Sequence, residues 1–148
     1  MSSPAKIRAV IFDWAGTVVD YGSRAPALAF VELFRRHGIA LTMEQARGPM
    51  GLHKRDHIAE LLRRLDVDRD LDGLYREFVP LQTSLLAEHA ALIPGTLEVV
   101  AELRRGGIRI GTTTGYTTAM MQALLPAARA QGFAPDVTVC ADEVPAGR

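Results

Sequence analysis

The alternation of hydrophobic and polar positions along the chain predicts three strands separated by amphipathic helices. A near-continuous apolar run, rich in Val and Ile, begins at Ile7 and ends at Asp13. Such a run is typical of a strand buried on both faces of a parallel sheet. Residues 108–114 (IRIGTTT) and the short run Val137–Cys140 predict a second and a third strand. The strands are therefore far apart in sequence, and helical patterns fill the intervals between them.

The interval from about residue 25 to residue 90 has a helical pattern throughout. Thr42 and Gln45 form a predicted capping box for a short helix that ends near residues 48–49. The last helix of this interval ends near residue 90, and we expect Pro80 to kink or divide it. The other predicted helices span residues 25–37, 54–65, 97–105 and 116–130.

The order of these elements is a strand, a block of helices and then two helix–strand units. This order predicts an α/β fold, a parallel Rossmann-like sheet with a helical cap inserted after its first strand. We expect the core to comprise residues 1–20 and 94–148 and the cap to comprise residues 21–93. Three parallel strands are few, because both faces of such a sheet are normally buried. Either the last strand is an edge or the core is truncated at the C-terminus, and we favour an incomplete core.

Composition narrows the class of protein further. The 148 residues include 17 basic and 17 acidic side chains, and 48% are hydrophobic, which fits one globular domain. A net charge near zero gives no reason to expect nucleic acid or an anionic membrane as a partner. No apolar run approaches the roughly 20 residues of a membrane span. With Cys140 alone, no intramolecular disulfide or cysteine zinc site is expected, and we expect a cytoplasmic protein.

Two strand ends carry candidate chemistry. Asp13 ends the first strand, at the sheet edge where open α/β folds place their ligands, and Gly16 permits a tight turn beside it. The alternative is a carboxylate that only caps a turn. Residues 112–116 (TTTGY) place hydroxyl groups and a glycine at the end of the second strand. They suit either phosphate binding at a helix N-terminus or an ordinary helix cap.

Two cationic positions are further candidates. Lys54 and His57 stand three residues apart and therefore on one face of a helical turn. Lys54 is either a solvated surface charge or a desolvated amine that forms a Schiff base, with the histidine moving protons nearby. Arg148 follows a Pro and a Gly and either neutralises an anion or is simply solvated.

These motifs together resemble the haloacid dehalogenase superfamily. DWAGTVVD (13–20) is similar to its first motif, although Ala15 stands where the family usually has a second Asp. This difference, combined with ARGPMGLHKRDHI (46–58), resembles the phosphonoacetaldehyde hydrolase (phosphonatase) branch. TTTGYTTAMM (112–121) is similar to the second motif, and DEVPAGR (142–148) to the approach to the third. The resemblance covers residues 7–148.

The resemblance implies a mechanism for cleaving the carbon–phosphorus bond of phosphonoacetaldehyde. Lys54 would form an iminium with the aldehyde, and Asp13 would attack phosphorus to give an aspartyl phosphate, which water hydrolyses to phosphate while acetaldehyde is released. The Asp13 carboxylate and the Ala15 carbonyl would hold Mg²⁺. The replacement at Ala15 is consistent with this chemistry, because no leaving oxygen needs protonation.

The resemblance also implies roles for other residues. Closure of the cap over the core would assemble the site, and the relatives' Mg²⁺ site is completed by an Asp on a later strand that this chain lacks. The insert is shorter than is typical between about residues 63 and 74, and a homodimer through the cap is expected. The implied substrate-binding residues are Met50, Gly51, Thr114, Gly115, Tyr116 and Arg148, with His57 at the aldehyde end beside Lys54.

Two alternatives stay open at this point. The first is a related phosphatase with another substrate, although Lys54 argues against it because ester cleavage needs no amine. The second is a catalytically inactive fragment that only binds, which the missing Asp of the metal site favours. Activity that survives replacement of Lys54 would support the first alternative, and failure to bind Mg²⁺ would support the second.

Overall fold

The structure, a computed structural model, describes residues 6–145. Within these residues, no helix combines the length and the apolar character of a membrane span. The strands are β1 (Ala9–Phe12), β2 (Arg109–Thr113) and β3 (Val137–Val139). The helices are α1 (Arg24–Arg36), α2 (Met43–Arg47), α3 (Lys54–Leu65), α4 (Leu71–Glu88), α5 (Thr96–Arg105), α6 (Thr118–Ala130) and the 3₁₀ turn η1 (Ala141–Glu143).

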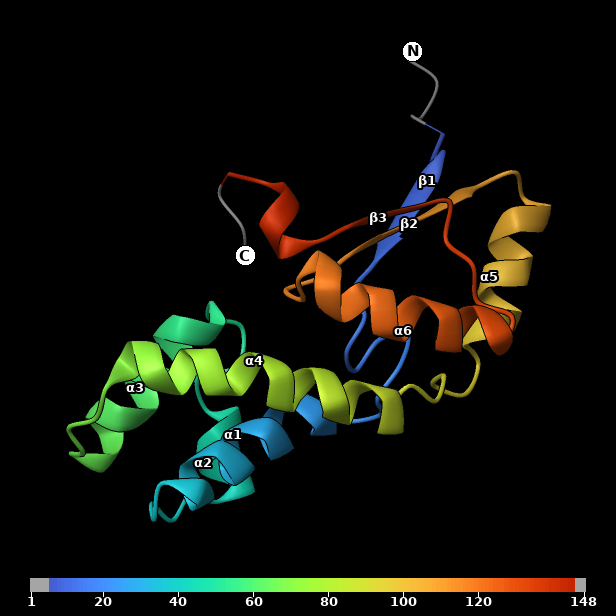
Figure 1. Ribbon diagram of the computed structural model, residues 1–148. Coiled ribbons are helices and arrows are strands. Elements are labelled where there is room, and N and C mark those ends of the chain that lie inside the picture. The colour runs from blue at the N-terminus through green and yellow to red at the C-terminus, as the bar shows by residue number, and fades with distance from the viewer. Residues whose placement is uncertain (1–5, 146–148) are drawn as a thin grey trace.

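The described strands form one parallel sheet in the order β1-β2-β3. The predicted α/β fold, with a helical insertion of α1–α4 after the first strand, is therefore confirmed. Figure 1 shows α5 and α6 on the same side of this sheet. On the opposite side, Ile11 and Val137 flank Gly111 and are 69% and 56% exposed. The prediction that the first strand is buried on both faces is thus wrong within the described residues.

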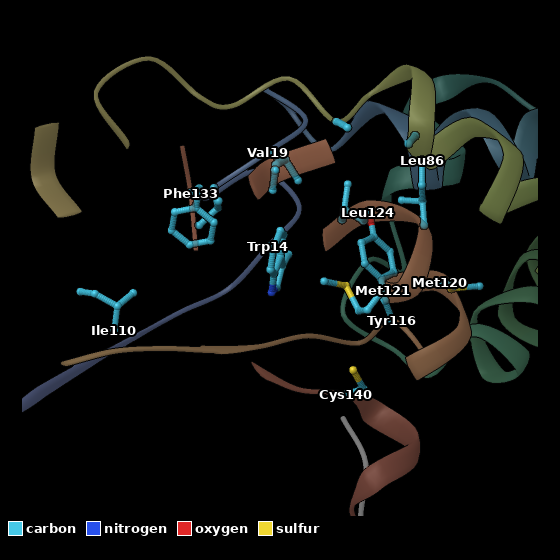
Figure 2. Packing of buried hydrophobic residues seen from close by; sticks show 14 of the residues in the cluster. Trp14, Val19, Leu86, Ile110, Tyr116, Met120, Met121, Leu124, Phe133 and Cys140 are labelled. Atoms are coloured by element: carbon cyan, nitrogen blue, oxygen red, sulfur yellow. The ribbon is translucent and has the colours of Figure 1, made fainter. Parts of the chain in front are cut away.

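Two hydrophobic clusters hold the described chain together. The core cluster lies between the sheet and α6, and in it Trp14 meets Phe133 edge to face with ring centroids 5.5 Å apart (Figure 2). The cap cluster lies among α1–α4. There, the fully buried Phe30 ring is stacked between Phe78, at 4.4 Å, and His57, at 3.8 Å. Burial of one such ring contributes about 2–3 kcal/mol.

The helices agree closely with those predicted from the sequence, except at Pro80 and at the start of α6. The predicted capping box of Thr42 and Gln45 is present, each side chain accepting the other's backbone N–H. Pro80 does not divide α4, which runs unbroken through it. Pro80 and Arg76 both lie on the exposed side, where water can satisfy the carbonyl that a proline leaves unpaired. The helix predicted from residue 116 begins two residues later, because the Thr117 hydroxyl caps it.

The two segments that connect the insert to the core run side by side. The backbone N–H of Asp20 donates to Ala91 O at 3.2 Å, and Ile93 N–H donates to Val18 O at 2.8 Å. The buried Asp20 carboxylate also accepts the backbone N–H groups of Arg24 and Ala25, at 2.9 and 2.8 Å. A carboxylate at this position satisfies the first N–H groups of α1 and favours its dipole. These contacts fix where the insert leaves the sheet.

Candidate active site

A cavity of about 260 Å³ lies where the insert meets the carboxyl ends of β1 and β2. In open α/β sheets this is the edge at which ligands bind. Both parts of the chain contribute to the cavity: one wall comes from the loops after the two strands and the other from α1 and the α2–α3 loop. The lining residues are Asp13, Ala15, Ser23, Pro26, Met50, Gly51, Leu52, His53, Lys54, Thr114, Gly115 and Tyr116.

The turn after β1 presents Asp13 and Ala15 to the cavity. Asp13 Oδ1 accepts the Trp14 backbone N–H at 2.8 Å, which orients the carboxylate. Gly16 has φ 79°, a left-handed conformation that favours glycine. A Cβ at this glycine would clash with Ser23 Oγ. The turn therefore needs glycine both for its backbone conformation and for the close approach of the insert.

The loop after β2 presents Thr114, Gly115 and Tyr116. Thr114 Oγ1 accepts the Tyr116 backbone N–H at 3.1 Å, so the hydroxyl hydrogen of Thr114 can donate to a ligand. The Tyr116 ring lies in the core cluster beside Met120 and Met121 (Figure 2). Its buried hydroxyl has no hydrogen-bond partner among the described residues. Burial raises the pKa of Tyr116 well above its usual range, with the charges of Asp20 and Asp13 adding to the effect.

The α2–α3 loop brings Met50 through Lys54 to the cavity. Lys54 is the first residue of α3, and its Nζ lies 6.0 Å from the Phe30 ring centroid. The amine is therefore held between the cavity and the apolar cap cluster, not at an open surface. A lysine that acts as a nucleophile must lie where a carbonyl substrate can reach it, and Lys54 lines the cavity.

His57 is fully buried beneath Lys54 and is not among the residues that line the cavity. Its ring stacks on Phe30, and its Nε2 lies 2.9 Å from the Ala46 carbonyl oxygen. Because a carbonyl only accepts, Nε2 carries the hydrogen of a neutral imidazole. Burial lowers the pKa of His57 to about 4, and the charges of Lys54 and Arg64 lower it further.

Eight of the residues expected at the site converge on the cavity. They are Asp13, Ala15, Met50, Gly51, Lys54, Thr114, Gly115 and Tyr116. His57 lies next to them but inside the cap cluster, and Arg148 lies outside the described residues. Sequence reasoning missed Ser23, Pro26, Leu52 and His53. A signal for the last two existed, because they adjoin Lys54 in sequence.

The oxygen donors at the Asp13 turn fit a hard divalent cation. Within residues 6–145, no group of three or more His, Cys, Asp or Glu is placed to hold a metal ion. Mg²⁺ does not require such a cluster, since it commonly uses one or two carboxylates together with water and substrate phosphate oxygens. The Asp13 carboxylate and the Ala15 carbonyl are donors of this kind.

Comparison with known proteins agrees with this fold. The family model described as haloacid dehalogenase-like hydrolase matches residues 7–148, and the chain belongs to this family. Within the family it is similar to phosphonoacetaldehyde hydrolases. The enzyme of that name from Paraburkholderia phytofirmans is 48% identical over 96% of this chain, and the one from Pseudomonas paraeruginosa is 46% identical over 99%.

A solved structure of a similar protein has the same fold as this chain. The crystal structure of a phosphonoacetaldehyde hydrolase like protein from Oleispira antarctica superposes with a TM-score of 0.89, at 39% sequence identity. The match covers 100% of this chain and 60% of that one. This chain likewise spans 58% of the length of the two Paraburkholderia and Pseudomonas enzymes.

Proposed function

We propose that this chain carries the catalytic centre of a phosphonoacetaldehyde hydrolase, which cleaves a carbon–phosphorus bond to give acetaldehyde and phosphate. One observation carries the proposal: a single cavity is lined by Lys54 from the insert and by Asp13 from the core. Phosphate-ester cleavage does not need an amine that forms an imine, although it can use a lysine charge to bind phosphate. Cleavage of a carbon–phosphorus bond does need such an amine, because an imine can accept the electron pair that the departing carbon keeps. The similarity to phosphonoacetaldehyde hydrolases supports the same conclusion.

Lys54 supplies the group that accepts electrons. Its neutral amine adds to the aldehyde carbon, and loss of water gives an iminium. When the carbon–phosphorus bond breaks, its electron pair moves toward the iminium nitrogen and leaves an enamine on Lys54. Protonation of the enamine carbon and hydrolysis of the resulting iminium release acetaldehyde and restore the amine.

Asp13 supplies the nucleophile. Its carboxylate attacks phosphorus as the carbon departs, and water then hydrolyses the aspartyl phosphate. The Asp13 carboxylate and the Ala15 carbonyl would hold Mg²⁺, which supplies positive charge against the phosphonate oxygens. In ester cleavage an acid protonates the oxygen that leaves phosphorus. Here carbon leaves instead, so the reaction does not need an acidic side chain at residue 15.

The remaining residues bind and orient the substrate in this proposal. The Thr114 hydroxyl and the Gly115 backbone would face the phosphonate, and Arg148, which lies outside the described residues, would supply a cation. Met50, Gly51 and Tyr116 surround the aldehyde end. His57 supports Lys54 from below, because its ring packs against the same Phe30 that borders the amine.

Product release tests the proposal. Wild-type protein with Mg²⁺ and phosphonoacetaldehyde is expected to form acetaldehyde and phosphate in equal amounts. Both products should disappear in Lys54→Arg, which keeps the charge but not the nucleophilicity, and in Asp13→Asn. The other lysine of the chain, Lys6, gives the matched control Lys6→Arg, which should retain activity. Phosphonate cleavage that persists in Lys54→Arg, or cleavage of phosphate esters alone, would contradict the proposal.

A further inference from the structure

We infer that Asp142 positions the loop that binds the phosphonate group, by holding the end of this loop against the 3₁₀ turn η1. The inference rests on the proposed function only in taking Thr114 and Gly115 as the phosphonate site. Asp142 does not line the cavity, and its Oδ1 accepts both the backbone N–H and the hydroxyl hydrogen of Thr118, at 2.9 and 3.0 Å. Asp142 therefore acts on the site through the loop and is a positioning residue.

The loop after β2 is attached at three successive points to the part of the chain that runs from β3 into η1. Thr114 N–H donates to Val139 O at 3.1 Å, and Ala141 N–H donates to Tyr116 O at 3.0 Å. The contact of Asp142 with the start of α6 is the third point, and Figure 1 shows η1 beside the first turn of α6. Only this third contact uses a side chain of η1, so a substitution can remove it while the two backbone contacts stay available.

The turn that carries Asp142 is itself fixed to the core. The Cys140 side chain is buried in the core cluster (Figure 2), and the Cys140 backbone N–H donates to Glu143 Oε2 at 2.6 Å. The Thr118 backbone N–H lowers the pKa of the Asp142 carboxyl, so this group is charged at neutral pH. Hydrogen bonds to a charged acceptor are stronger than those to a neutral one. The contact is therefore suited to holding the loop in one place.

The charge of Asp142 and its positioning role have opposite effects on anion binding. The carboxylate lies at the first residue of α6, where it offsets the positive end of the helix dipole. If only charge mattered, removal of the carboxylate would tighten the binding of an anion to the neighbouring loop. A positioning role predicts weaker binding instead, because the Thr114 hydroxyl and the Gly115 backbone would no longer be held in place. The sign of the change therefore separates the two effects.

Binding of inorganic phosphate in the presence of Mg²⁺ tests the inference, and calorimetric titration of the whole chain measures it. Asp142→Ala removes both contacts with Thr118 and should weaken phosphate binding about 10-fold. Asp142→Asn keeps an acceptor oxygen, so it should bind phosphate as tightly as wild type or more tightly. Asp68→Ala is the matched control, because it removes an exposed acidic side chain between α3 and α4. This control should bind phosphate like wild type.

A second measurement distinguishes positioning of the loop from a general loss of structure. Acetaldehyde carries no phosphonate group, so its adduct with Lys54, trapped by cyanoborohydride and measured by mass spectrometry, does not depend on the loop. This adduct should form at the wild-type rate in Asp142→Ala. Thr118→Val removes only the hydroxyl part of the contact and should weaken phosphate binding less than Asp142→Ala does. Combining these two substitutions should cause no further loss, because both remove the same contact.

The outcomes separate the inference from the proposed function. Weaker phosphate binding in Asp142→Ala, with Asp142→Asn at least as tight as wild type and the acetaldehyde adduct unchanged, supports the inference. The same phosphate affinity in the two Asp142 variants, or a parallel loss of the adduct in Asp142→Ala, overturns it. A wild-type chain that binds no phosphate also overturns it. A wild-type chain that binds phosphate but forms no Lys54 adduct contradicts only the proposed function.

Discussion

At the scale of single residues, burial decides what the two ionisable rings beside the site can do. The His57 ring is held neutral in the cap cluster, and burial lowers its pKa to about 4. The Tyr116 hydroxyl is also buried, and burial raises its pKa. Neither group is expected to change its charge near neutral pH in the folded chain. Neither group therefore acts through a change of charge at neutral pH, and the contribution of each to binding or stability can be measured.

His57 makes the stability of the fold depend on pH. An unfolded histidine gains a proton below about pH 6.5, whereas the folded one stays neutral down to about pH 4. Protons therefore favour the unfolded chain in this window, and stability falls as pH falls through it. Between pH 7 and pH 5 the free energy of unfolding should drop by about 2 kcal/mol more in wild type than in His57→Gln. Urea denaturation at the two pH values measures this, and His37→Gln should behave like wild type.

The Tyr116 hydroxyl should contribute to binding but not to stability. A buried hydroxyl without a partner opposes folding by about 1–3 kcal/mol. Tyr116→Phe is therefore expected to leave the free energy of unfolding unchanged or to raise it, while substrate binding weakens. Urea denaturation together with the KM for phosphonoacetaldehyde gives both values. Tyr21→Phe, at a side chain that is 79% exposed, is the control. A marked loss of stability in Tyr116→Phe would show that the hydroxyl is satisfied in solution.

At the scale of elements, the turn after β1, which carries Asp13, is in direct contact with the start of the insert. Trp14 O accepts the backbone N–H groups of Thr17, Val18 and Val19 within 3.1 Å, which closes the turn tightly around Gly16. Ser23, at the start of α1, lies against this glycine. The contact between Gly16 and Ser23 therefore links the position of the Asp13 turn to the position of the insert.

Two glycines allow the effect of this contact to be separated from backbone strain. Gly16 and Gly38 have similar angles, φ 79° and 72°, but a Cβ at Gly38 would meet nothing within 4 Å. Alanine at either position should cost about 1–2 kcal/mol of stability from the left-handed backbone. Only Gly16→Ala should also displace the Ser23 hydroxyl and slow adduct formation at Lys54. Equal rates in the two variants would show that the Ser23 contact does not position the site.

At the scale of the whole molecule, the two faces of the sheet are in different environments. The face toward α5 and α6 is buried, and Ile110 on it has no exposed surface. The other face presents Ile11 and Val137 to solvent within the described residues. The relatives compared above are longer than this chain, since it spans 58–60% of them.

This difference between the faces predicts unequal effects of the same substitution. Ile110→Ala removes buried methyl groups and should lower the free energy of unfolding by about 2–5 kcal/mol. Ile11 lies on the exposed face of the neighbouring strand, so Ile11→Ala should lower the free energy of unfolding by less than about 1 kcal/mol. Urea denaturation of dilute protein measures both. A loss at Ile11 as large as that at Ile110 would show that the exposed face is covered in solution.

The sequence predicted the three parallel strands, the helical insertion and most of the cavity, because each depends on local pattern. Asp13 and Thr114 follow apolar strands, and parallel topology brings strand ends together. The exposed face of β1 could not be predicted, since burial depends on which elements cover a strand. The spacing of Lys54 and His57 also could not show that Lys54 lines the cavity while His57 is buried in the cap cluster. The path of the α2–α3 loop decides that, and it also places His53 at the site.

The central claim is that Lys54 forms an imine with an aldehyde in this cavity, and borohydride trapping tests it most directly. The chain contains two lysines, Lys6 and Lys54, so peptide mass mapping after reduction assigns an adduct without ambiguity. We predict that phosphonoacetaldehyde and borohydride modify Lys54 and leave Lys6 unmodified, and that excess inorganic phosphate slows the reaction. A folded protein that forms no adduct at Lys54, or that is modified equally at Lys6, would contradict the account.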